Sequence, residues 1–444
     1  ISVEIDGVGQ HASITPIIDT GNGTVSEFNI VRSGNGFTTA PKLIISHPQS
    51  FKKAEYFLNN TNNLKDTTIN CIFTDNNTKD YYVAGNTLDQ FNNRIGFVTK
   101  YSQSGDKIWS KTARSNQPSG QDTYCDFSAI YVDINSTTQD VYVTGTTKPN
   151  SLNINYNPDI VLMKFNQSGG GANVGIQYQK ELAGISGSTR EDVVTSITRV
   201  GDNKFCIGGY TNTNSSNPYD AFLVVFNENL IIQQKRKIST TDSSEKVTDL
   251  RYNPDTNKFY ALLEVAPSTT SSAKSFAIAE CEAQQFMLSV SAVVNFGTTG
   301  FSVWDPKFDI DEFGDFYISG TAYSGSNSNS VFVGKISGIG TTNTIVWAKR
   351  WVPTGSVSWR NLKVIGGNVD VFGEYNLGYN YEVNESTTTF DAYRKQSEVS
   401  KVKYDGTVLS TNVIKFTRNI TGFEINDMLS DASGDPIVVG RAYR

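Results

Sequence analysis

The run Asp140-Val141-Tyr142-Val143-Thr144-Gly145-Thr146-Thr147 decides the fold of this chain, because versions of it return along most of the sequence. A second run, Asp159-Ile160-Val161-Leu162-Met163-Lys164-Phe165, follows it after a polar stretch. The same pair of runs is found at residues 80–101, 204–226 and 315–336. Aromatic and β-branched residues bounded by glycine and asparagine are typical of short strands and turns. A repeat of about 50–65 residues built only from short strands indicates a radial array of small sheets.

Each copy also has a strand before this pair of runs and another after it. The first strand usually ends in Asp or Asn, as at Ile69–Asp75, and the fourth is seen at Lys107–Lys111 and Thr344–Lys349. Short polar turns between neighbouring runs are hairpin signals. Four antiparallel strands followed by a new copy predict one blade of a β-propeller.

A glycine ends the second strand of most copies and allows the copies to be counted. These glycines are Gly85, Gly145, Gly209, Gly320, Gly373 and Gly440. One spacing is about twice the usual step, so a copy without the glycine is expected at Lys258–Val265. The sequence therefore predicts an all-β protein whose propeller has about seven four-stranded blades. The last copy reaches Arg444 after two strands, and Lys53–Leu58 is placed to complete its sheet and close the ring.

Residues 1–50 follow a different pattern and are predicted to form a small N-terminal β module. Short alternating runs are separated by glycine-rich turns at residues 7–9 and 21–23. Gly34-Asn35-Gly36-Phe37-Thr38-Thr39-Ala40-Pro41 then precedes a further apolar run. The chain is thus divided into a module at 1–50, expected to serve attachment or assembly, and a propeller at 51–444.

The composition excludes several classes of function. The net charge is −6 and no long basic run occurs, which argues against nucleic acid as a partner. The two histidines, His11 and His47, precede the repeats, so a histidine-based triad or zinc site within the repeats is excluded. The four cysteines occupy non-equivalent places and are expected in the core. No apolar run approaches the length of about 18 residues that a membrane helix needs, so no membrane insertion is expected.

The repeat resembles the bacterial β-propeller repeat called SBBP. The pattern strand–Asp–x–x–Gly–x–[Val/Ile]–Tyr–[Val/Ile]–x–Gly–x–Thr, then Asp–Ala–Phe–[Val/Leu]–x–Lys–[Phe/Tyr], spans most of residues 66–444. Gly314-Asp315, Gly434-Asp435, Trp109 and Trp347 match it best, whereas the copies from Val247 and Asn361 depart from it. This resemblance implies a propeller found in extracellular or surface proteins and implies no activity. Residues 1–50 resemble a module of marine tailed-phage structural proteins that carries a Gly-x-Gly-[Tyr/Phe]-Thr-x-x-Pro turn.

One candidate cation loop contains Asp309, Asp311 and Asp315. Hard cations prefer several oxygen ligands on a loop turned by glycine, which Gly314 supplies. Phe313 stands where an EF-hand loop has Asp or Asn, and no bidentate Glu follows. An ordinary strand-to-strand turn is therefore favoured, with calcium as the alternative and no other cofactor expected.

The connection predicted at Glu374–Ser397 is the longest between a second and a third strand, and it carries Tyr375, Tyr379, Tyr381 and Tyr393. Exposed tyrosine together with Asn and Gly is typical of recognition loops. These four residues are the candidate contacts with a partner or receptor, and the alternative is that their rings pack on their own blade. The face that carries such loops is expected to bind, because loop length varies most there.

Together these observations favour a non-catalytic function. We predict a structural and binding protein of a tailed-phage virion, part of the tail, baseplate or a fibre, and therefore extracellular. Its partners would be other virion proteins in a larger symmetric assembly, and a host surface glycan or protein. The propeller axis would be lined by strand backbone and small polar residues and would carry no chemistry. The alternatives are a bacterial cell-surface adhesion or scaffold propeller, and a propeller hydrolase or lyase that cleaves glycans.

Overall fold

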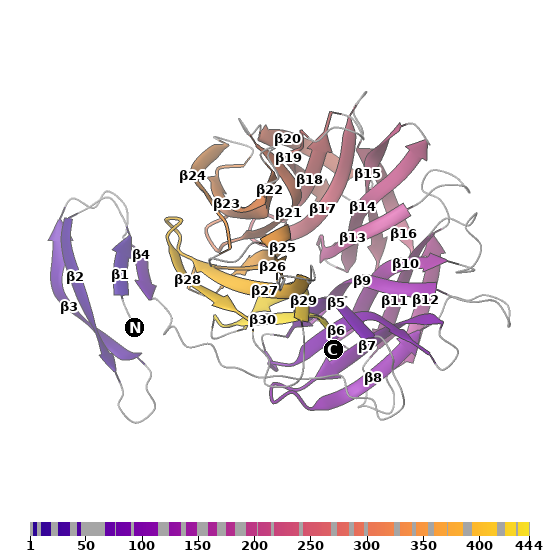
Figure 1. The fold of residues 1–444 in the computed structure, drawn as a ribbon, viewed down its shortest axis with the longest axis horizontal. Coiled ribbons are helices and arrows are strands. Elements are labelled where there is room, and N and C mark those ends of the chain that lie inside the picture. The colour runs from indigo at the N-terminus through magenta and orange to yellow at the C-terminus, as the bar shows by residue number, and fades with distance from the viewer. Residues whose placement is uncertain are drawn as a thin grey trace.

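The computed structural model describes the strands of the N-terminal module and most of the repeat region. The described residues are 3–6, 10–18, 25–35, 42–45, 67–75, 77–89, 93–113, 124–134, 139–148, 159–166, 175–182, 192–201, 203–214, 217–238, 243–267, 273–283, 288–296, 301–323, 329–339, 343–353, 359–370, 372–384, 393–414, 422–431 and 434–443. In the N-terminal part, β1 (Val3–Asp6) pairs with β4 (Lys42–Ile45), and β2 (Gln10–Ile18) pairs with β3 (Val25–Asn35). Figure 1 shows these two-stranded sheets beside the blades, as a separate group.

Six sheets of four antiparallel strands form complete blades of a β-propeller (Figure 1). The first strands of blades 1 to 6 are β5 (Thr67–Thr74), β9 (Tyr124–Val132), β13 (Asp192–Arg199), β17 (Ser244–Asn253), β21 (Ser302–Ile310) and β25 (Trp359–Val369). The second strands are β6 (Tyr81–Leu88), β10 (Val141–Lys148), β14 (Lys204–Asn214), β18 (Lys258–Ala266), β22 (Phe316–Tyr323) and β26 (Tyr375–Asn384). The third strands are β7 (Arg94–Tyr101), β11 (Asp159–Asn166), β15 (Asn217–Asn227), β19 (Ser275–Ala283), β23 (Asn329–Ser337) and β27 (Tyr393–Val402). The fourth strands are β8 (Lys107–Ala113), β12 (Gly175–Leu182), β16 (Ile232–Ile238), β20 (Leu288–Phe296), β24 (Thr344–Trp351) and β28 (Val408–Val413).

A sheet of two strands, β29 (Gly422–Ser430) and β30 (Pro436–Tyr443), takes the seventh position of the ring. β29 packs between the first strands of blades 6 and 1. Asn426 donates a side-chain hydrogen bond to the carbonyl oxygen of Ile69 at 2.8 Å, which joins this sheet directly to β5. The predicted β-propeller is confirmed with a correction to its blades: six positions hold four strands, and the seventh holds two within the described residues. The predicted closing strand, Lys53–Leu58, lies outside the described residues.

The glycine of the repeat is explained by a β-bulge in the first strand. In blades 1 to 3 and in the seventh position, the register between first and second strands shifts by one residue near the same point. A Cβ atom on Gly145 would lie 1.9 Å from the carbonyl oxygen of Asp126, and Gly209 and Gly440 meet strand-one oxygens at the same distance. Only glycine fits such a contact. The expectation that Gly373 ends the second strand of its copy is wrong, because this residue lies in the turn before β26 with φ 75°. Tyr379 occupies the position opposite the bulge that Gly145 occupies in blade 2.

An aspartate at the end of a first strand caps the turn that follows. Asp311 accepts hydrogen bonds from the amides of Phe313 and Asp315, both at 2.9 Å. Asp370 does the same in blade 6 for two amides of its own turn. The recurring Asp therefore has a local structural role, as expected of turn residues whose side chains bond to nearby amides.

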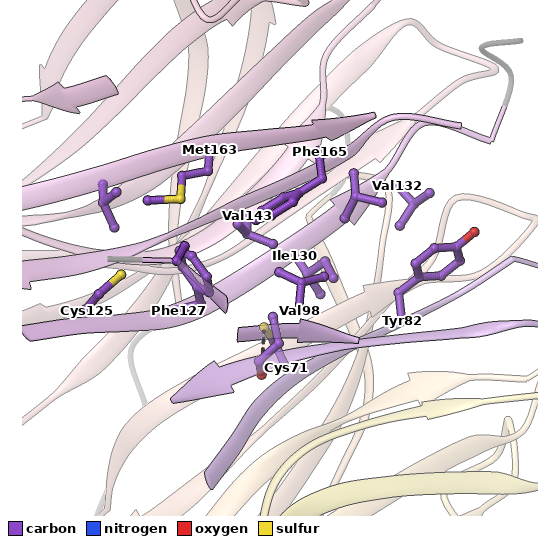
Figure 2. Packing of buried hydrophobic residues seen from close by; sticks show 14 of the residues in the cluster. Cys71, Tyr82, Val98, Cys125, Phe127, Ile130, Val132, Val143, Met163 and Phe165 are labelled. Atoms are coloured by element: carbon purple, nitrogen blue, oxygen red, sulfur yellow. Dashed lines mark hydrogen bonds between the residues drawn. The ribbon is translucent and has the colours of Figure 1, made fainter. Parts of the chain in front are cut away.

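The hydrophobic core lies between neighbouring blades. Figure 2 shows one such cluster, in which Tyr82 and Val98 of blade 1 meet Phe127 and Phe165 of blade 2. The cysteines are buried and free of disulfide bonds, as expected for core residues: Cys71, Cys125, Cys206 and Cys281. Because each blade is covered on both faces, the ring holds its first strands firmly around the axis.

Candidate functional site

A cavity of about 740 Å³ lies on the propeller axis, and we call it the axial channel. Its wall is built from first strands, namely β5, β9, β13, β17, β25 and β29, with Lys307 from β21. In each of these first strands, the residues that line the channel run from the bulge to the C-terminal end of the strand. The axial channel therefore occupies the half of the axis nearer the turns between first and second strands.

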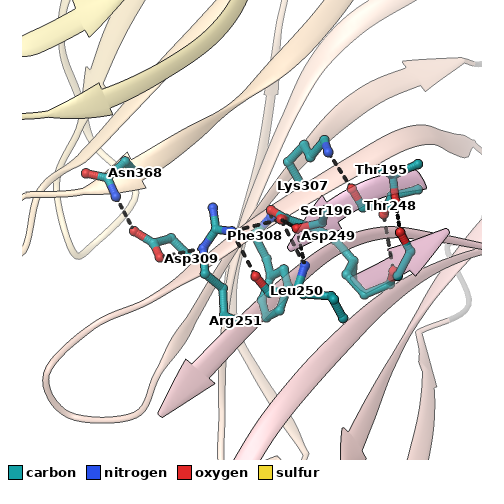
Figure 3. A network of polar contacts seen from close by, with 12 residues as sticks. Thr195, Ser196, Thr248, Asp249, Leu250, Arg251, Lys307, Phe308, Asp309 and Asn368 are labelled. Carbon is teal, nitrogen blue, oxygen red and sulfur yellow. Dashed lines mark hydrogen bonds and ion pairs between the residues drawn. The ribbon is translucent and has the colours of Figure 1, made fainter. Parts of the chain in front are cut away.

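The axial channel contains a polar network centred on Arg251 (Figure 3). The guanidinium donates from Nη1 to Asp249 Oδ1 at 2.8 Å and from Nε to Asp309 Oδ1 at 3.1 Å, which joins blade 4 to blade 5. Burial opposes the charge of Arg251, but the carboxylates of Asp249 and Asp309 outweigh it and raise the pKa of Arg251. Burial also raises the pKa of Asp309. The side chain of Arg251 stays 34% exposed, so it remains accessible to a molecule in the channel.

The network continues in both directions around the ring. Asn368 of blade 6 donates to Asp309 Oδ2 at 2.7 Å, and the Asn368 side-chain oxygen accepts from the amide of Ser430 at 3.0 Å. On the other side, the hydroxyl of Ser196 in blade 3 donates to Asp249 Oδ1 at 3.2 Å. A polar path thus runs from blade 3 to the seventh position.

Lys307 adds a second cation to the wall. It comes from β21, and its ammonium group donates a hydrogen bond to the carbonyl oxygen of Thr248 in blade 4 (Figure 3). An ammonium group has three donors, so this bond leaves capacity for a ligand.

Asp427 lies just after the bulge of β29, at the junction of the seventh position with blade 1. Its Oδ2 accepts from the amide of Ile72 at 3.0 Å, and its Oδ1 accepts from the amide of Met428 at 2.8 Å. Burial raises the pKa of Asp427 to about 6, against the smaller opposing effects of these amides and of Lys307 and Arg251. A carboxyl with a pKa close to neutral can both give and take a proton under ordinary conditions.

The expectation of an axis lined by strand backbone and small polar residues is wrong. The wall carries Asp249, Arg251, Lys307 and Asp427. Sequence reasoning missed these residues because the bulge reverses the alternation of side chains along each first strand. A signal was nevertheless present, since an aspartate follows the bulged position in both β17 and β29.

The three candidate calcium ligands do not converge on one point. Asp309 faces Arg251, whereas Asp311 and Asp315 bind the ammonium group of Lys335 at 3.3 and 3.0 Å. The positive charge of Lys335 occupies the place that a cation would need, which supports the favoured interpretation as a turn. Across the described ranges, no three His, Cys, Asp or Glu side chains are grouped to hold a metal ion. The described residues also contain no helix that is long and apolar enough to cross a membrane.

Three of the four candidate tyrosines are buried in β26 instead of standing on a loop. Tyr375 and Tyr379 are fully buried, and Tyr381 is 3% exposed. Tyr379 donates to the buried carboxylate of Glu398 at 2.5 Å, and Tyr381 donates to its other oxygen. The expectation of an exposed recognition loop is therefore wrong for these three. The alternative, packing on their own blade, holds in part, because all three rings lie in a core cluster shared with blade 5. Tyr375 stacks on Tyr317 of that neighbouring blade.

Tyr393 is placed differently. It begins β27, is 36% exposed, and has the guanidinium carbon of Arg360 at 3.3 Å from its ring centroid. Binding of a partner by Tyr393 stays a prediction. The intervening residues 385–392 lie outside the described part of the chain.

No protein-family model and no curated protein matches this sequence. Among solved structures, the ectodomain of the parainfluenza virus 5 hemagglutinin-neuraminidase is similar with a TM-score of 0.38 and 11% identity, over 75% of this chain and 84% of that chain. An ulvan lyase from a new polysaccharide lyase family has a TM-score of 0.46 and 10% identity, over 83% of this chain and 91% of that chain. An α-L-arabinofuranosidase from Fusarium graminearum has a TM-score of 0.43 and 11% identity, over 86% and 94%. At such identities the likeness concerns the fold alone.

The charged axial channel corrects the prediction that the chain is not an enzyme. That prediction rested on an expected absence of reactive groups at the axis, and the channel wall carries Asp249, Arg251, Lys307 and Asp427. The resemblances of the repeats to SBBP and of residues 1–50 to a phage module stay predictions.

Proposed function

We propose that the axial channel binds a glycan and that Asp427 transfers a proton during cleavage of a glycosidic bond there. The supporting observation is that one cavity combines hydrogen-bond donors, acceptors and a carboxyl with a pKa of about 6. Pockets for small ligands measure about 300–1,000 Å³, a range that includes the axial channel.

A saccharide suits this wall because its hydroxyl groups both donate and accept hydrogen bonds. Asp249 supplies acceptors, while Arg251 and Lys307 supply donors. Tyr131 and Tyr252 also line the channel and add aromatic surface, against which the apolar face of a sugar ring can pack. The cations and carboxylates nearly balance, which favours a polar ligand of low net charge.

Cleavage requires a proton donor for the leaving oxygen and a second carboxylate to assist the attacking water. In this proposal Asp427 gives its proton to the glycosidic oxygen as the bond between that oxygen and the anomeric carbon breaks. Asp249 accepts a proton from the attacking water while the water oxygen bonds to the anomeric carbon, so that the products are one alcohol and one hemiacetal sugar. Arg251 and Ser196 hold Asp249 in a fixed orientation for this role.

The test is a panel of neutral and acidic polysaccharides incubated with the purified protein, with released oligosaccharides measured by mass spectrometry. The protein is expected to cleave a member of the panel, and Asp427→Asn is expected to lower the rate at least about 100-fold. Asp305→Asn is the matched control, because Asp305 is 57% exposed and does not line the axial channel. Cleavage that survives Asp427→Asn, or a protein that neither binds nor cleaves any glycan, would contradict the proposal.

The placement of the protein on a tailed-phage virion remains a separate prediction, which rests on the resemblance of residues 1–50. It predicts that the protein is attached to a tail, baseplate or fibre. Antibody labelling of intact particles from the source organism, viewed by electron microscopy, would test it independently of any activity in the channel.

A further inference from the structure

A buried cluster of one lysine and two carboxylic acids lies beside the turn between the first and second strands of blade 6. Asp370 follows β25, Glu374 precedes β26, and Lys401 belongs to β27. The side chain of Asp370 has no exposed surface, that of Glu374 is 1% exposed, and that of Lys401 is 9% exposed. We call these three residues the blade 6 triad.

The ammonium group of Lys401 contacts both carboxylates of the triad. Its Nζ lies 2.9 Å from Asp370 Oδ2 and 3.1 Å from Glu374 Oε2, and it also donates to the carbonyl oxygen of Gly434 at 3.1 Å. These contacts use all three donors of the ammonium group. Glu374 Oε1 has no hydrogen-bond partner within the described residues. Two buried acids thus share the ammonium group of one lysine.

This arrangement allows a proton to move from the lysine to the glutamate. Burial raises the pKa of Glu374, against the opposing effect of Lys401. Burial opposes the charge of Lys401, but Asp370 and Glu374 outweigh it and raise the pKa of Lys401. The ion pair is therefore the resting form. Transfer of one proton across the contact of 3.1 Å converts Lys401 into a neutral amine, which is a nucleophile.

The backbone holds the carboxyl group of Asp370 in a form that suits nucleophilic attack. Its Oδ1 accepts hydrogen bonds from the amides of Phe372 at 2.9 Å and Glu374 at 3.0 Å, while Oδ2 faces Lys401. Two amides on one oxygen stabilise the negative charge that a tetrahedral intermediate places there. The turn fixes these donors, because the amide of Asp370 in turn donates to the carbonyl oxygen of Glu374 at 2.8 Å.

We propose that Lys401 and Asp370 condense to an intramolecular amide bond, with Glu374 as the proton carrier. Nζ gives one proton to Glu374, and its lone pair then forms a bond to Asp370 Cγ. The Cγ–Oδ2 bond breaks, and its electron pair stays on Oδ2. Oδ2 takes one proton from Glu374 and one from Nζ and leaves as water, so the amide keeps one N–H and Glu374 is restored.

The buried position of the triad favours this condensation over the ion pair. Two groups held in contact react as if at a very high concentration. Formation of the amide also removes two opposite charges from a site where both have lost their hydration. The bond would join the end of the first strand of blade 6 to its third strand, and this inference does not depend on what the axial channel binds.

Blade 5 contains a similar cluster in a more open form and provides an internal comparison. Lys335 lies 3.3 Å from Asp311 and 3.0 Å from Asp315. Asp315 is 23% exposed, and Lys335 also donates to the hydroxyl of Tyr317 at 3.1 Å. Water that reaches Asp315 stabilises the charged form, so this cluster is expected to stay an ion pair.

The test is the mass of the intact, denatured full chain, measured by electrospray mass spectrometry. The unaltered protein is expected to be lighter than its sequence mass by one water, about 18 Da. Tryptic digestion should yield residues 364–394 joined to residues 396–403, because trypsin does not cleave after an acylated lysine. Lys401→Arg is expected to keep the full mass, and Glu374→Gln to form the bond at least about 100-fold more slowly. Lys335→Arg is the matched control and should lose the water like the unaltered protein.

Three outcomes would overturn the proposal. A full sequence mass of the unaltered protein, with residues 364–394 and 396–401 recovered as separate peptides, would leave the triad as an ion pair. A loss of water that persists in Lys401→Arg would place the dehydration elsewhere, such as a cyclic imide at Asp405-Gly406. A loss of water that Lys335→Arg abolishes would assign the bond to blade 5, against the argument from burial. The unaltered protein and its peptides decide the question even if a variant does not fold.

Discussion

Gly145 and Asp427 owe their roles to the same backbone irregularity, the bulge in the first strand of a blade. The bulge pushes a carbonyl oxygen toward the second strand, where only glycine leaves room for it. It also turns the residue that follows it toward the axis, which brings the carboxyl of Asp427 into the channel wall. At the residue scale, the repeat and the candidate site therefore have a common structural cause.

Asp427→Asn is expected to change how stability depends on pH. The pKa of about 6 in the folded protein lies above the ordinary value of 3.8, so the folded state binds this proton more tightly than the unfolded state. Stability present at acid pH is therefore lost as the pH rises from about 4 to about 6. Because the side chain of Asp427 is only partly buried, solvent screens its charge, and we expect a loss of about 1–2 kcal/mol rather than the full value for such a shift.

The variant lacks this titration and should gain that amount relative to the unaltered protein between pH 4 and pH 7. Urea unfolding at several pH values measures it, with Asp305→Asn as a control that keeps the original profile. Parallel profiles for the unaltered protein and Asp427→Asn would show that Asp427 does not titrate in this range.

Gly145→Ala is expected to destabilise the propeller by about 2–4 kcal/mol, because the new Cβ would collide with a backbone oxygen that cannot move away. Gly373→Ala is the comparison. Gly373 has φ 75° but no heavy atom within 4 Å of the new Cβ, so only the backbone conformation costs energy, about 1–2 kcal/mol. The free energy of unfolding in urea should rank the two variants in this order, and a reversed order would argue against the collision.

At the scale of elements, β26 shows how a strand can be mistaken for a loop. Its tyrosines alternate with Asn and Gly, a composition shared with recognition loops. The turn at Gly373 ends one residue before the strand begins, and β26 then pairs with β27 along its whole length and with β25 over most of it. Tyr379 and Tyr381 share the carboxylate of Glu398, so each ring is buried together with its polar end.

Tyr379→Ser is accordingly expected to cost about 3–5 kcal/mol, since it removes a buried ring and one of the two tyrosine donors to the buried carboxylate of Glu398. Tyr393→Ser should change stability by no more than about 0.5 kcal/mol, because that ring is partly exposed at the strand end. Chemical denaturation of the two single variants makes the comparison. Similar losses in both would contradict the different burial of the two side chains.

At the scale of the whole molecule, the ring depends on the junction between the seventh position and blade 1. Asn426 and Asp427 bond to the backbone of β5 across this junction. A small apolar cluster formed by Ile72, Val83, Phe97 and Val439 adds to it. The junction also forms part of the axial channel wall, so closure of the ring and assembly of the candidate site are coupled.

Deletion of residues 51–60 is expected to lower the melting temperature by at least about 5 °C, because the two-stranded sheet would keep an open edge. Deletion of residues 1–45 is the control and should shift it by less than about 2 °C. Differential scanning calorimetry of both truncated chains measures the effect. An unchanged melting temperature after the first deletion would mean that the ring closes without this segment.

The sequence by itself determined the fold class and the approximate number of blades. Alternating strands, turn glycines and capping aspartates are local signals, and their repetition along the chain leaves a radial array of sheets as the consistent arrangement. The glycines that end the second strands of four copies were identified correctly from the sequence, although the sequence did not show that a bulge in the first strand requires them.

Only the tertiary structure decided which side chains meet at the axis. Asp249, Arg251, Asp309 and Asp427 come from three different sheets, and a bulge of one residue reverses the direction of each side chain that follows it. Tertiary packing also decided that Tyr375, Tyr379 and Tyr381 are core residues, because burial depends on the neighbouring blade and not on the residues adjacent in the chain.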